Sequence, residues 1–177
     1  MTAHITVIIA LLVSAWLITC SVCDWRKREV PTWLAVIPMA MAVLWSAIYG
    51  NAPAALLAVL MLLATNFERS PAILLSIVSL AFVLFLGCFI LDHTFELFLP
   101  IFIILGIALL WFFGGTGGSD AMILMSITLV FGTPALMYAI FAGGVFGVVG
   151  LAIKKKTMPY VIPITTGMIV YFATQLI

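Results

Sequence analysis

Residues 30–67 read VPTWLAVIPMAMAVLWSAIYGNAPAALLAVLMLLATNF and contain no charged side chain. An uncharged apolar run of this length is typical of membrane-spanning segments, each of which needs about 20 residues. The run is long enough for two short spans, and Gly50-Asn51-Ala52-Pro53 supplies a turn between them. This stretch therefore predicts a helical hairpin that crosses a membrane twice.

The whole chain is rich in apolar residues and poor in charged ones. Hydrophobic residues make up 66% of it and charged residues only 7%, whereas about 25% of a soluble domain is charged. Continuous apolar runs indicate helices, because the strands of a membrane barrel alternate in polarity. We therefore expect an all-α fold, a polytopic transmembrane helix bundle in the lipid bilayer, with one domain over residues 1–177. The net charge of +1 provides no basic surface for nucleic acid.

Basic residues divide the chain into spans. All seven fall in three groups: Arg26, Lys27 and Arg28; Arg69; and Lys154, Lys155 and Lys156. Since cytoplasmic loops are rich in Lys and Arg, each group is expected to face the cytoplasm, with an even number of crossings between groups. The prediction is about eight spans with both termini outside, provided that Gly132-Thr133-Pro134 breaks the run 121–153 in two. An arrangement of about six spans with a re-entrant segment is the alternative.

Acidic residues close to membrane spans are expensive, which makes them functional candidates. The chain has six: Asp24, Glu29, Glu68, Asp92, Glu96 and Asp120. Asp24 closes the first apolar run, and Asp120 follows the glycine-rich segment 114–118, so both are predicted on the cytoplasmic side. Asp92 and Glu96 are expected on the opposite side. Two facing carboxyl groups can share one proton, so that one acts as base and the other as acid when water attacks a peptide bond.

Structural roles are the alternative for these residues. Asp24 could belong to a solvated loop, and Ser119 or Asp120 could cap the helix that follows. A structural zinc site needs about four ligands, and the Cys-x-x-Cys pair in the first apolar run has no second pair. We therefore interpret the cysteines as small buried apolar side chains and expect no metal or cofactor; they are Cys20, Cys23 and Cys88.

Three segments together resemble the type IV prepilin peptidase family. Asp24-Trp25-Arg26-Lys27-Arg28-Glu29-Val30-Pro31 resembles its first signature, an Asp followed by an Arg two residues later and a Pro seven residues later. Gly114-Gly115-Thr116-Gly117-Gly118-Ser119-Asp120 resembles its second, Gly-x-Gly-Asp, with Ser119 at the second glycine. The segment from Lys156 to Pro163 resembles the basic and proline-rich approach to its last span.

This resemblance implies a membrane aspartic endopeptidase with Asp24 and Asp120 as the catalytic pair. Its partners would be prepilin-like or preflagellin-like precursors, whose short basic leaders are cut at the cytoplasmic face of the cell membrane. Candidate substrate-binding residues are Gly117, Gly118, Ser119, Arg26, Glu29 and Glu68. The segment between the first two spans is too short for the methyltransferase domain of the larger family members. The chain is therefore similar to the compact, peptidase-only branch.

Three other interpretations stay open. A noncatalytic membrane protein, such as a small transporter or an assembly subunit, would use Asp24 and Asp120 as structural caps. A transporter usually carries an internal repeat and polar groups near the bilayer midplane, and neither is visible here. A presenilin-like protease would place its first aspartate inside a span after a tyrosine, unlike Cys23-Asp24-Trp25. A family member inactivated by the change at Ser119 is the third.

Overall fold

The computed structural model describes residues 3–49, 51–64, 71–91, 95–114, 116–152 and 159–176. Within these ranges the chain forms seven α-helices and no strand, which confirms the predicted all-α class. The helices are α1 (Ala3–Lys27), α2 (Thr32–Tyr49), α3 (Ala52–Ala64), α4 (Pro71–Leu91), α5 (Phe95–Phe112), α6 (Gly118–Ala152) and α7 (Val161–Leu176).

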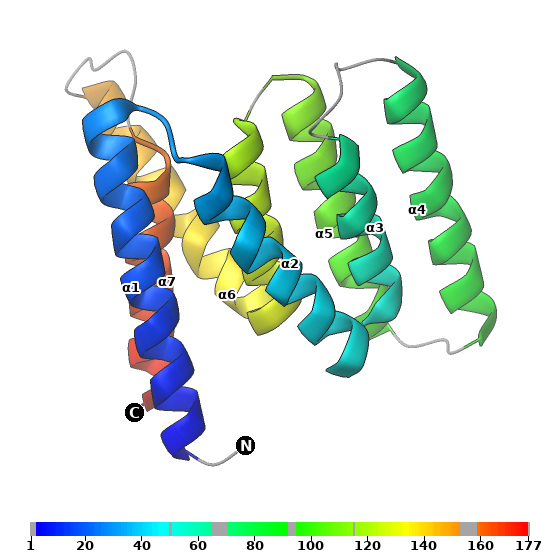
Figure 1. Ribbon diagram of the computed structural model, residues 1–177, viewed down its shortest axis with the longest axis horizontal. Coiled ribbons are helices and arrows are strands. Elements are labelled where there is room, and N and C mark those ends of the chain that lie inside the picture. Colours follow the sequence, from blue (N-terminus) through cyan, green and yellow to red (C-terminus); the bar gives the residue numbers. More distant parts are fainter. Residues whose placement is uncertain are drawn as a thin grey trace. The chain divides into compact units, whose positions relative to one another are not determined.

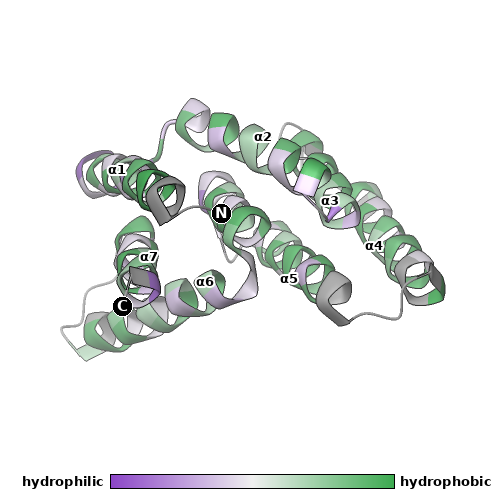
Figure 2. Cartoon of the chain, turned by 90° about the horizontal axis from the view of Figure 1, so that it is seen from below, coloured by the Kyte–Doolittle hydropathy of each residue, from purple (hydrophilic) through white to green (hydrophobic). Residues whose placement is uncertain are grey.

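Apolar residues predominate on these helices, with few hydrophilic positions among them (Figure 2). Three segments are long and apolar enough to cross a membrane: Val7–Lys27, Thr32–Tyr49 and Gly118–Val149. Large apolar side chains such as Leu11, Ile48 and Phe141 lie on the surface, 66–75% exposed. Water solvates such a surface poorly and lipid solvates it well. This combination is typical of a membrane protein.

A helix break occurs where the uncharged run 30–67 predicts a turn. Helix α2 ends at Tyr49, and α3 begins at Ala52. The Asn51 Oδ1 atom accepts the backbone N–H of Ala54 at 3.2 Å, which is the bond an N-cap residue makes. The Ser46 hydroxyl donates to the Asn51 carbonyl oxygen at 3.1 Å and ties the two helix ends together.

Helix α6 is broken inside, also at a predicted position. Gly132 has φ 74° and ψ −171°, a conformation outside the helical region that glycine adopts without steric penalty. Pro134 follows it two residues later. The break leaves helical segments over 118–131 and 133–152. Every residue from 121 to 129 is buried, so neighbouring helices shield the shorter first segment, as expected for a helix that is apolar all round.

The chain forms two compact units. One comprises Met1–Pro31 with Pro134–Ile177, and the other Thr32–Thr133. The boundaries fall directly after Pro31 and directly after the break in α6. Asp24 therefore belongs to the first unit and Asp120 to the second. The prediction of one domain over residues 1–177 stays a prediction.

In the first unit, α7 lies antiparallel to α1 (Figure 1). The hydroxyl groups of Ser21 and Thr165 form a hydrogen bond of 2.7 Å between these two helices. On its other side, α7 packs against the second segment of α6 with no room for a side chain. A Cβ added at Gly167 would lie 2.6 Å from the Cα of Ala139 and closer still to the Tyr138 carbonyl oxygen. Small residues permit such close approach of helices in membranes.

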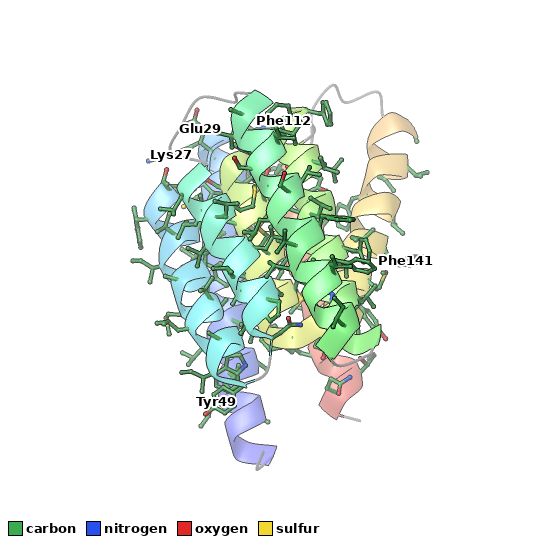
Figure 3. The ribbon with its side chains drawn as sticks, turned by 90° about the vertical axis from the view of Figure 1, so that its right-hand side faces the viewer. Lys27, Glu29, Tyr49, Phe112 and Phe141 are labelled. Carbon is green, nitrogen blue, oxygen red and sulfur yellow. The ribbon has the colours of Figure 1, made fainter. Side chains whose placement is uncertain are left out.

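In the second unit, α3 packs against α2, α4 and α5, and α4 packs against α5. Successive helices run in opposite directions (Figure 1). Tyr49 at the end of α2 and Phe112 at the end of α5 lie toward opposite ends of this unit (Figure 3). The start of α2, the end of α5 and the glycine-rich loop therefore share one end.

Candidate active site

Asp24 lies in the last turn of α1 and is only 8% exposed. Its Oδ2 atom accepts the backbone N–H of Val161, the first residue of α7, at 3.0 Å. The first N–H groups of a helix have no partner within the helix, and an acidic side chain complements its positive end. Asp24 thus caps a helix from the far end of the sequence, and its interpretation as a solvated loop charge is wrong.

The end of α1 is locally strained. Arg28 follows the last helical residue, Lys27, and adopts φ 57°. Its N–H donates to the Asp24 carbonyl oxygen at 2.9 Å. The left-handed conformation costs a residue with a Cβ about 1–2 kcal/mol. The side chains of Arg26 and Glu29 are exposed beside it, and Figure 3 shows Lys27 and Glu29 at this end of the first unit.

The glycine-rich loop begins with a helix stop. Helix α5 ends at Phe112, and Gly114 adopts φ 79° while its N–H donates to the Trp111 carbonyl oxygen at 3.1 Å. This is the usual geometry of a glycine that ends a helix. Helix α6 then begins at Gly118, so Asp120 lies in its first turn rather than at the capping position. A carboxylate there also complements the helix dipole.

Gly117 leaves the space that the Asp120 carboxyl group occupies. A Cβ at Gly117 would lie 3.3 Å from the Asp120 Oδ2 atom, closer than ordinary van der Waals contact. Gly117 has no left-handed φ, so the requirement for glycine at this position is steric. Gly118 differs, because a Cβ there would meet Trp111 Nε1 at an ordinary 3.6 Å.

Ser119, the departure from the family's second glycine, lies in ordinary helical backbone within the first turn of α6. Among the described residues, Arg28 alone combines a side chain with a left-handed φ. The backbone at Ser119 therefore has no conformation that a glycine would relieve.

Among the cysteines, Cys20 is fully buried, which confirms its interpretation, whereas Cys23 is only partly buried; both are free thiols. For two of the predicted residues the structure describes no side chain. Glu68 lies outside the described residues, and the side chain of Cys88 does as well.

Sequence reasoning missed two groups. The Val161 backbone N–H holds Asp24, and no sequence pattern marks a backbone donor. Thr116 is 9% exposed, and its hydroxyl oxygen is buried without a hydrogen-bond partner. Its signal was available, because a single hydroxyl among the loop glycines is conspicuous.

The structure thus groups the predicted residues into two sets. Asp24, Arg26 and Glu29 lie together at the end of α1, and the loop glycines lie with Ser119 and Asp120 at the start of α6. The pairing of Asp24 with Asp120 stays a prediction. A scan against protein-family models and searches of curated proteins and of solved structures give no match to this chain.

Proposed function

We propose that the protein is a membrane aspartic endopeptidase that removes the short basic leader of prepilin-like or preflagellin-like precursors. Asp24 and Asp120 are its catalytic pair. In this proposal the chain crosses the cell membrane about eight times with both termini outside, so that cleavage occurs at the cytoplasmic face.

The fit between Asp120 and Gly117 carries the proposal. The Asp120 carboxyl group lies where a side chain at residue 117 would crowd it, with 3.3 Å from Oδ2 to the added Cβ. An acid at the third position of a helix can also take this space, when it reaches back toward the N-cap residue as in a capping box. An acid that acts on an extended peptide benefits from it, because glycine lets another backbone approach closely. The glycine and the aspartate of the second signature thus depend on each other.

The chemistry follows from two carboxyl groups that share one proton. The ionised group removes a proton from water as the water oxygen attacks the peptide carbonyl carbon. The protonated group supplies the proton that the leaving amide nitrogen needs, and the proton-sharing belongs to the pair. Arg26 and Glu29 are exposed at the end of α1, and Glu29 can meet a basic leader residue there.

The test is co-expression with a candidate precursor from the same genome, followed by immunoblotting for leader removal. We expect the wild type to cleave and Asp24→Asn and Asp120→Asn each to lose at least about a hundredfold in rate, the usual contribution of an acid–base group. Asp92→Asn is the matched control, because the sequence predicts it on the opposite face. Substantial cleavage by either catalytic variant would refute the pair. Loss of cleavage in a chelator that zinc restores would refute the metal-free mechanism.

A noncatalytic membrane protein is the second candidate, and the bond between Asp24 and the Val161 N–H favours it. In that case Asp24 serves to join α1 to α7. Asn at position 24 still accepts this bond through its amide oxygen. If the Asp24→Asn variant keeps its fold and loses cleavage, Asp24 acts in catalysis. If the variant keeps its biological role, Asp24 acts only as a cap.

A further inference from the structure

The contact between α1 and α7 contains a second polar attachment, about one helical turn away from Asp24. Ser21 on α1 and Thr165 on α7 join their hydroxyl groups at 2.7 Å. Thr165 is 6% exposed, and its Oγ1 atom also lies 2.9 Å from the Val161 carbonyl oxygen and 3.2 Å from the Leu17 carbonyl oxygen. All of these residues belong to the first unit, as Asp24 does.

The direction of each hydrogen bond at Thr165 follows from what its neighbours can donate. A hydroxyl group has one proton, and a carbonyl oxygen only accepts. The Thr165 proton therefore goes to the carbonyl oxygens of Val161 and Leu17, and Ser21 donates in the 2.7 Å bond. Val161 is thus held at both of its backbone polar groups, because its N–H donates to Asp24 Oδ2 at 3.0 Å.

Two attachments fix a helix more firmly than one. Ser21 and Asp24 are three residues apart on α1, and Val161 and Thr165 are four residues apart on α7, so each pair lies on one face of its helix. A single bond from Val161 to Asp24 would let α7 turn and slide about that point. The second attachment fixes the height and rotation of α7, so that the Val161 N–H stays against the Asp24 carboxyl group.

We propose that Ser21 and Thr165 are positioning residues for Asp24, which act through the Val161 N–H. This inference rests on the proposed protease function. Catalysis by a carboxyl pair requires each acid to keep its place closely, since displacement by about 1 Å costs about a hundredfold in rate. Both hydroxyl groups act by holding α7 against the acid, and neither takes part in the reaction itself.

The experiment compares Thr165→Val, Thr165→Ser and wild type in detergent, by cleavage kinetics with a candidate precursor and by amide hydrogen exchange of Val161, followed by NMR. Valine keeps the shape of threonine, but its methyl group cannot stay 2.7 Å from the Ser21 oxygen, because nonbonded contacts of carbon need about 3.5 Å. Helix α7 must then move away by roughly half an ångström.

We expect Thr165→Val to lower kcat about tenfold and to leave KM unchanged, because the shift affects the acid and not the binding of the precursor. The Val161 amide should exchange about fivefold faster, as for loss of one uncharged hydrogen bond. Thr165→Ser keeps the hydroxyl and should restore both values to within about twofold of the wild type.

Thr166→Val is the matched control, because Thr166 is the next residue of α7 and its hydroxyl donates to the Ile162 carbonyl oxygen of its own helix at 3.0 Å. It should leave kcat and the exchange of Val161 unchanged. Combining Thr165→Val with Ser21→Ala should lower kcat no further than Thr165→Val alone, since both changes remove the same bond.

A merely structural role for Thr165 would lower the unfolding temperature of Thr165→Val and leave its kcat and Val161 exchange like those of the wild type. That result overturns the inference, as does an equal loss of kcat in Thr165→Ser or Thr166→Val. Asp24→Asn in the same assay separates the two claims. If the wild type cleaves, Asp24→Asn does not, and Thr165→Val matches the wild type, this inference fails alone. If the wild type cleaves no precursor, the protease proposal fails and this inference fails with it.

Discussion

Asp24 and Asp120 each lie beside the first turn of a helix, but the two helix starts are built differently. Asp24 is 8% exposed, and its carboxyl group bonds to the N–H of Val161 from another helix. Asp120 is half-buried and lies in the first turn of its own helix, next to Gly117 and four residues after an unpartnered hydroxyl. The first arrangement holds an acid in place, and the second keeps an acid approachable.

The largest expected effect on cleavage concerns Gly117, the glycine beside Asp120. Gly117→Ala should lower cleavage by about tenfold, because the Asp120 carboxyl group must shift by a few tenths of an ångström to admit the new methyl group, and displacement by about 1 Å costs about a hundredfold in enzymes. Gly118→Ala is the control, since its methyl group meets Trp111 Nε1 at an ordinary 3.6 Å. Initial rates of leader removal measure both, and equal rates for the two variants would contradict the steric role of Gly117.

The next effect concerns stability, and it tests whether Asp24 holds the fold together more strongly than Asp120 does. Asp24→Ala should lower the free energy of unfolding by about 2 kcal/mol, because it leaves the Val161 N–H unpaired. Asp120→Ala should lower it by about 0.3–1 kcal/mol, as for a charge near a helix start. Denaturation in detergent measures both values. If Asp120→Ala is the more destabilising change, the contrast between the two sites is wrong.

Val161→Pro tests whether the lost hydrogen bond causes the lower unfolding free energy of Asp24→Ala. Proline is favoured at the first position of a helix, where it removes the N–H, and its ring also replaces the buried Val161 side chain. The lost bond should contribute about 1.5 kcal/mol, the usual worth of a bond to a charged group. Combined with Asp24→Ala, that part of the effect should vanish, since both changes remove the same bond. Fully additive losses would show that Asp24 and Val161 act separately.

A smaller effect concerns the strain beside Asp24. Arg28→Gly should be more stable than Arg28→Ala by about 1 kcal/mol, because glycine relieves the left-handed conformation and alanine does not. Both variants lack the arginine side chain, so their difference isolates the backbone. Equal unfolding free energies would place the strain elsewhere.

The smallest effect is expected at Ser119. Ser119→Gly should leave cleavage within about twofold of the wild type, because the backbone at this position is helical and already favours an ordinary residue. A large gain in cleavage rate would identify Ser119 as an inactivating change.

Local chemistry explains what sequence could predict here. The breaks at Asn51 and Gly132 follow from turn residues, and the all-α class follows from long uncharged runs. Helix partners were not predictable, because helices that are apolar on all faces have no polar side to indicate which face packs inward. For the same reason, the position of α1 beside α7 had no signal in the sequence. The bond from Val161 to Asp24 was hidden as well, since every residue except proline carries a backbone N–H.

The first unit joins α1 to α7, two helices that are far apart in the sequence, and this has a consequence for synthesis. Residues 32–133 form a continuous stretch that can assemble while the ribosome is still extending the chain. Helix α1 must wait for its partner until α7 has been made, because contacts between distant parts of a chain form late. During that interval Asp24 lacks the Val161 N–H, so the bond that joins α1 to α7 forms only after residue 161 has been made.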